Sequence, residues 1–131
     1  MKITVDTNVL VRGVVRDHEA QTRAADKVLK DASLIAVPLP CLCEFVWVLR
    51  KVYGFDKSDI AEAIRVLVGT EKVATNRPAV DAGLALLDAG GDFADGVIAH
   101  DGTMLGGDAF VSFDKNAVSR LTGLGRAARL L

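Results

Sequence analysis

The stretch MKITVDTNVL, residues 1–10, decides the fold of this chain. Ile3 and Val5 alternate with polar neighbours in a β-branched run, which predicts a short strand. The strand ends at Asp6, and the two polar residues after it supply cap chemistry for a helix that starts at Val9. A carboxylate at the end of a strand and beside a helix start lies where open α/β sheets build their ligand sites.

Working outward from residues 1–10, the same alternation of strands and helices continues along the chain. We expect strands over residues 3–5, 34–37, 72–74 and 109–113. We expect helices over residues 9–15, 19–31, 41–53, 58–69, 78–87 and 92–100, and a short one after residue 114. This order predicts an α/β fold with a central, mostly parallel sheet flanked by helices.

Length and composition narrow the class of protein. The chain has 131 residues, which is typical of one domain, so we expect residues 1–131 to form a single domain. Half of the residues are apolar and a quarter are charged, as in ordinary globular proteins. The sequence has no run long enough to span a membrane and no signal-peptide pattern, so we expect a cytoplasmic protein. The spacing of Cys41 and Cys43 fits neither a redox pair nor a zinc site and favours buried free thiols.

Acidic residues recur at the junctions between these elements. Asp6 and Asp114 each follow a predicted strand, and a parallel sheet would bring both to its carboxyl edge. Glu44 and Asp95 each fall in the first turn of a predicted helix, and Asp92 is three residues before Asp95, on the same helical face. Each acid by itself has a structural explanation, as a turn residue or as a favourable charge at a helix start. Together they predict a cluster of carboxylates.

Such a cluster needs a counter-charge. Two like charges about 4 Å apart cost on the order of 4 kcal/mol at an effective dielectric constant near 20. No Lys or Arg is adjacent in sequence to Asp6, Glu44 or Asp95, and Glu44 lies on an otherwise apolar helix face. A hard divalent cation would relieve the repulsion, and all-oxygen ligands suit Mg²⁺ or Mn²⁺ better than zinc. An acidic magnesium site points towards phosphodiester chemistry.

Four motifs in order give the chain a family resemblance. They are VDTNVLVR with Asp6, PCLCEFVWVL with Glu44, GGDFADGVIAH with Asp95, and FVSFDKNAV with Ser112 and Asp114. In this order and spacing the sequence resembles a PIN-domain ribonuclease, and more narrowly the VapC-type toxins of bacterial toxin–antitoxin pairs. One departure from the family pattern is the glycine after Asp95, where a larger residue is usual; it leaves the acid untouched.

The resemblance implies a function. It implies a metal-dependent endoribonuclease in which Asp6, Glu44, Asp95 and Asp114 bind one or two Mg²⁺ or Mn²⁺ ions. A metal-bound water would attack the phosphorus in line and leave a 5′-phosphate and a 3′-hydroxyl. The resemblance also implies an RNA substrate, a cognate antitoxin and a homodimer, and we expect the apolar surface around Trp47 to lie at a protein interface.

Other residues are candidates for supporting roles. Asn8 and Ser112 are each two residues from a proposed metal ligand, and either could orient a carboxylate or a bound water; Asp92 is a further peripheral candidate. Arg12 and Lys115 flank the predicted site and are candidates for drawing in the RNA backbone. Three cations of the tail could extend that track: Arg120, Arg126 and Arg129.

Two alternative functions remain open from the sequence. A receiver-type phosphoacceptor module also gathers acids and Mg²⁺ at a sheet edge, but it needs an Asp after its third strand, and Glu44 inside a helix does not fit. The second alternative is a catalytically silent protein with the PIN fold that only binds a partner. Incubation with RNA, Mg²⁺ and EDTA would distinguish the three.

Overall fold

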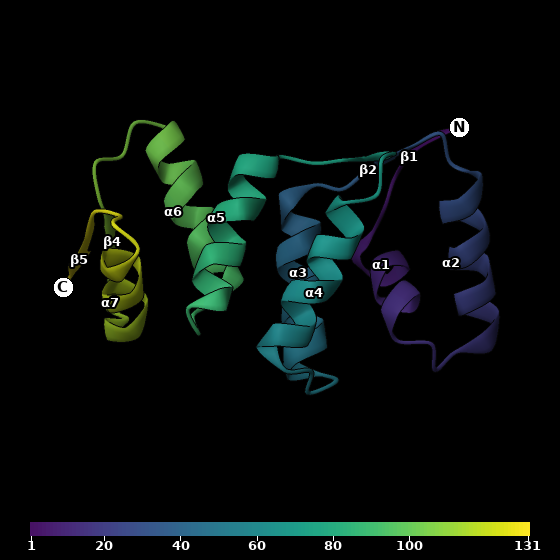
Figure 1. The fold of residues 1–131 in the computed structure, drawn as a ribbon, viewed down its shortest axis with the longest axis horizontal. Coiled ribbons are helices and arrows are strands. Elements are labelled where there is room, and N and C mark those ends of the chain that lie inside the picture. The colour runs from purple at the N-terminus through teal and green to yellow at the C-terminus, as the bar shows by residue number, and fades with distance from the viewer. The chain divides into compact units, whose positions relative to one another are not determined.

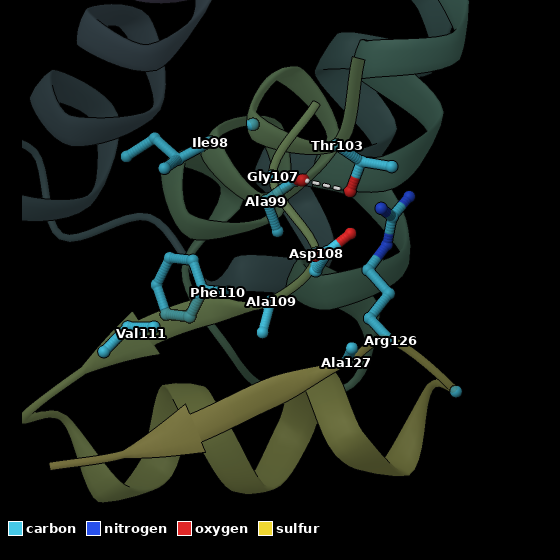
Figure 2. Close-up of a pocket in the computed structure, with 12 residues that line it drawn as sticks. Ile98, Ala99, Thr103, Gly107, Asp108, Ala109, Phe110, Val111, Arg126 and Ala127 are labelled. Atoms are coloured by element: carbon cyan, nitrogen blue, oxygen red, sulfur yellow. Dashed lines mark hydrogen bonds between the residues drawn. The ribbon is translucent and has the colours of Figure 1, made fainter. Parts of the chain in front are cut away.

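The computed structural model describes all 131 residues, and they divide into two compact units. The first unit comprises Met1–Asn76 and the second Arg77–Leu131. Figure 1 shows the chain coloured from purple at the N-terminus to yellow at the C-terminus. Each unit contains its own parallel sheet and its own helices, so each is described by itself.

The first unit is a three-stranded sheet with four helices. Its strands are β1 (Lys2–Thr4), β2 (Leu34–Ala36) and β3 (Val73–Ala74). Its helices are α1 (Thr7–Val14), α2 (Glu19–Asp31), α3 (Leu39–Lys51) and α4 (Lys57–Val68). The strand order is β1-β2-β3, and both pairs are parallel, with Ile3 opposite Ile35 and Ile35 opposite Val73.

Apolar side chains from the sheet and all four helices form the core of the first unit. Helix α1 packs against both α2 and α3, and α3 also contacts α4. The most buried side chains of α3 and α4 recur at helical spacing, as the sequence pattern predicts; they are Leu42, Phe45, Leu49, Ile60 and Ile64. Outside this core, His18 begins α2, and its Nδ1 accepts a hydrogen bond from the backbone N–H of Gln21 at 3.1 Å. His18 therefore has a structural role as the N-cap of α2.

The second unit is a helix pair followed by a two-stranded sheet and a third helix. Its helices are α5 (Arg77–Asp88), α6 (Phe93–Met104) and α7 (Lys115–Gly123). Its strands are β4 (Phe110–Ser112) and β5 (Ala128–Leu130), which pair in parallel. Leu86 and Leu121 are fully buried in its core, and Phe110 packs against them.

Helices α5 and α6 approach closely because each carries a glycine at the contact. A Cβ added to Gly96 would lie 2.5 Å from the backbone oxygen of Ala82, and one added to Gly83 would lie 2.6 Å from Cε2 of Phe93. Both distances are below any real Cβ contact. The glycine at position 96, which departs from the usual family pattern, therefore sets the spacing of this helix pair.

The α/β class and the parallel pairing of strands are confirmed, while several boundaries differ from the prediction. The five strands form two sheets, in which β1 pairs with β2 and β4 with β5. Strand β5 lies where no strand is predicted from the sequence. Helix α3 begins two residues earlier than predicted, because Pro40 is accommodated in its first turn, so the prediction that Glu44 lies in the first turn is wrong. None of the helices combines the length and the apolarity that a membrane span requires.

Candidate metal centre

Asp6 connects β1 to α1 in the first unit. It is the N-cap of α1, and its Oδ1 accepts a hydrogen bond from the backbone N–H of Thr7 at 2.8 Å. The strand predicted over residues 3–5 ends at Thr4, so Asp6 lies two residues beyond β1 and is held there by its place as the N-cap of α1. Asp6 is exposed, and only one of its two carboxylate oxygens takes part in a protein hydrogen bond.

Glu44 is tied to the same strand–helix junction through Thr7. The hydroxyl of Thr7 donates to Oε2 of Glu44 at 2.6 Å, and its oxygen also lies 3.8 Å from Sγ of Cys41. Burial raises the pKa of the Cys41 thiol, and the negative charges of Asp6 and Glu44 raise it further. Both carboxylates are therefore close enough to Cys41 to affect the pKa of its thiol.

Three acids gather in the second unit. Asp92 is the N-cap of α6 and accepts from the backbone N–H of Ala94 at 3.1 Å. Asp95 lies in the first turn of the same helix, as predicted. Asp114 follows β4 and is the N-cap of α7, where its Oδ1 accepts from the backbone N–H groups of the second and third helical residues at 3.0 and 3.1 Å.

The pKa of Asp95 is affected by the other two acids. Burial raises the pKa of Asp95, and the negative charges of Asp92 and then Asp114 raise it further. None of the three forms an ion pair with a Lys or Arg of the chain. Carboxylates without a cationic partner attract cations, and carboxylate oxygens suit Mg²⁺ or Mn²⁺.

The structure thus places the predicted ligands in two sets. Asp6 and Glu44 lie at one junction of the first unit, and Asp95 and Asp114 lie near Asp92 in the second. The structure contains no group of three or more His, Cys, Asp or Glu side chains that could hold a metal ion. The chemistry of the donors fits a hard divalent cation, and a single site of four carboxylates stays a prediction.

The candidates for supporting roles differ in what they contact. The hydroxyl oxygen of Ser112 accepts from the backbone N–H of Asp114 at 2.9 Å, so Ser112 shapes the turn that carries this acid. Asn8 is exposed and lines a shallow groove between α1 and α2, together with Arg12. Neither side chain forms a hydrogen bond with a carboxylate group in this structure.

The two predicted RNA contacts also differ. Arg12 is largely engaged within its own unit: one guanidinium nitrogen pairs with Asp17, and Nη2 donates to the hydroxyl of Tyr53 at 3.0 Å. Its side chain is only 17% exposed. Lys115, by contrast, is exposed at the first position of α7, directly after Asp114. Of the two, Lys115 has the freer charge.

Thr7 is the residue that sequence reasoning missed. Thr7, Leu10 and Val11 are the buried residues of α1, and their spacing is that of one helix face. That spacing was visible in the sequence, but placing the helix start at Val9 left Thr7 outside the helix.

Comparison with known proteins agrees with the fold and the motifs. The sequence profile of the PIN domain matches residues 3–123, which extend over both units. The chain therefore belongs to the PIN domain family. Among curated proteins, none matches the chain. Membership of this family favours a metal-dependent nuclease.

Proposed function

We propose that this chain is a metal-dependent endoribonuclease that acts as the toxin of a VapC-type toxin–antitoxin pair. The observation that carries the proposal is the coincidence of two findings. The chain is a PIN domain over residues 3–123, and none of its four motif acids has a cationic partner. Three of the four follow a strand or begin a helix, and the fourth, Glu44, lies in the second turn of α3. The proposal takes residues 1–131 to act as one PIN domain, which the span of the family match supports.

In this proposal Asp6, Glu44, Asp95 and Asp114 together hold Mg²⁺ or Mn²⁺, with Asp92 at the periphery. Three of these five acids use one oxygen to cap a helix, which holds the carboxylate in place before any cation arrives. Burial is the main cause of the raised pKa of Asp95, and the charges of Asp92 and Asp114 add to it; a cation would relieve that added repulsion.

When bound, the cation would lower the pKa of a coordinated water and offset charge on the phosphate oxygens. The chain's own residues do the remaining work. Within the second unit, the Ser112 hydroxyl holds the turn before α7, which carries Asp114. Lys115 supplies an exposed positive charge next to Asp114, which would draw the RNA backbone towards an otherwise acidic surface. The tail cations Arg120, Arg126 and Arg129 would extend that attraction.

The proposal includes two protein partners, a cognate antitoxin and a second copy of the chain. A toxin that cleaves RNA would act in the cytoplasm, where its substrate is. Exposed apolar side chains on α3, at its C-cap and on α4 support an interface in the first unit; they are Trp47, Val52 and Val66. The same surface also favours the second candidate, a catalytically silent PIN domain that only binds a partner. The PIN family match leaves no reason to retain a receiver module.

Cleavage of RNA by purified Asp6→Asn tests the proposal. Asparagine keeps the oxygen that caps α1 and removes the charge, so the fold should persist while cleavage in Mg²⁺ is lost. Asp59→Asn is the matched control, because Asp59 is an exposed acid in the first turn of α4. We expect wild type and Asp59→Asn to cleave in Mg²⁺ and to stop in EDTA.

Two results would contradict the nuclease. One is cleavage by Asp6→Asn at the wild-type rate with metal binding intact. The other is a wild-type protein that binds Mn²⁺ and its partner without cutting any RNA from the source cell, which would favour the silent PIN domain instead.

A further inference from the structure

We propose that Thr7 is a positioning residue that holds two metal-binding carboxylates at once. It does so through its backbone N–H to Asp6 and through its side-chain hydroxyl to Glu44. This inference rests on the proposed function, since it assumes that both acids bind the cation. It adds a residue that the four acidic motifs do not include.

The geometry at Thr7 is unusual because one residue serves two acids from different elements. Its N–H lies 2.8 Å from Oδ1 of Asp6, and its hydroxyl oxygen lies 2.6 Å from Oε2 of Glu44, which is 37 residues away in the sequence. The second distance is short, as expected for a hydroxyl that donates to a charged carboxylate. Thr7 thereby links the end of β1 to the second turn of α3.

Burial favours the hydrogen bond from the Thr7 hydroxyl to Glu44. Thr7 is 6% exposed, so water does not compete strongly for its hydroxyl. Its β-branched side chain has few rotamers in a helix, and in the observed one the hydroxyl meets Glu44. A hydroxyl has a single proton to donate, and the carboxylate at 2.6 Å is a far better acceptor than the Cys41 sulphur at 3.8 Å.

The arrangement leaves ligand capacity open on both acids. Thr7 uses Oδ1 of Asp6 and Oε2 of Glu44, and the other oxygen of each carboxylate has no hydrogen-bond partner in the protein. Those two oxygens are fully available to a cation. Groups that orient metal ligands in this way typically change metal affinity or activity by about 10–100-fold when they are removed.

Removal of the hydroxyl at constant shape tests the role of Thr7. Thr7→Val deletes the donor and keeps the branched volume, while Thr7→Ser keeps the donor. Thr22→Val is the matched control, because Thr22 is also 6% exposed in the first unit and its hydroxyl has no partner. Mn²⁺ binding by the full chain is measured by calorimetry, and RNA cleavage is measured as a function of Mn²⁺ concentration.

We expect Thr7→Val to bind Mn²⁺ roughly 10–100-fold more weakly than wild type, with cleavage largely restored at saturating Mn²⁺. Thr7→Ser and Thr22→Val should bind Mn²⁺ with an affinity within about 3-fold of wild type, because neither substitution removes the hydroxyl that orients Glu44. If Thr7→Val does not fold, by circular dichroism, Thr7→Ala removes the same donor and should show the same weakened binding.

Three results would overturn this inference, and they separate it from the proposed function. Equal Mn²⁺ affinity in wild type and Thr7→Val would refute the role of Thr7 and leave the nuclease standing. Equal weakening in Thr7→Ser and Thr7→Val would assign the effect to packing instead of the hydroxyl. A wild-type chain that binds no Mn²⁺ would overturn the proposed metal site itself, and the role of Thr7 with it.

Discussion

The contact between α5 and α6 gives a sharp prediction for Gly96→Ala. The new Cβ would lie 2.5 Å from the backbone oxygen of Ala82, 2.8 Å from Cα of Gly83 and 3.0 Å from the Ala82 carbonyl carbon. All three neighbours are backbone atoms of α5, so no side chain can rotate away. To reach an ordinary contact, the two helices would have to separate by about 0.9 Å.

The magnitude follows from two opposing effects. Overpacking a close contact costs about 1–3 kcal/mol, and the upper end applies here because backbone must move. Alanine gains about 1 kcal/mol over glycine through its helix propensity. We therefore expect Gly96→Ala to lower the free energy of unfolding by about 2 kcal/mol, which corresponds to a Tm lower by roughly 6–12 °C in a chain of this size.

Gly102→Ala is the control because Gly102 lies in the same helix and a Cβ there would meet nothing within 4 Å. It keeps the propensity gain without the clash, so we expect about 0.5–1 kcal/mol more stability than wild type. Urea unfolding followed by circular dichroism measures both variants. If Gly96→Ala is as stable as Gly102→Ala, the close approach of α5 and α6 is not a feature of the folded protein.

Two further predictions concern charge and assembly. The raised pKa of Asp95 means that the folded protein binds the proton of this carboxyl group more tightly than the unfolded chain does. The stabilisation that Asp95 contributes to the folded state is therefore lost as the pH rises from about 3.9 through the folded pKa of Asp95. Asp92→Asn keeps the capping oxygen and removes one charge, so it should raise Tm at about pH 7 and change it little at about pH 3; equal shifts at both pH values would contradict this. Trp47 is 60% exposed on α3, and we expect a dimer at micromolar concentration that Trp47→Glu dissociates, measured by light scattering. A monomeric wild type would count against the dimer.

Strongly patterned segments were predictable from sequence because their periodicity reflects a buried face. Residues 19–31 form α2 with the predicted bounds, and the apolar spacing in residues 41–53 located α3 to within two residues. Strand β5 has no such pattern. Its three residues are mostly exposed, and pairing with β4 defines it, a non-local property that no short window of sequence contains.

The same contrast between local and long-range features applies to the candidate site. That Asp6 and Asp114 stand at strand ends could be predicted because a strand end and a helix cap are local features. The hydrogen bond from Thr7 to Glu44 joins residues 37 positions apart, and the one from Arg12 to Tyr53 spans 41. Such links depend on how α1 packs against α3, so no local sequence pattern could predict them.

Three of the acids, Asp6, Asp92 and Asp114, begin helices as well as carrying charge. Asparagine caps helices about as well as aspartate, and the codons of the two residues differ by a single base. At each of these positions one base substitution can therefore remove the charge while the helix start is kept. Selection against the activity would then leave folded, inactive descendants instead of unfolded ones, and these would retain every surface through which the parent recognised its partners.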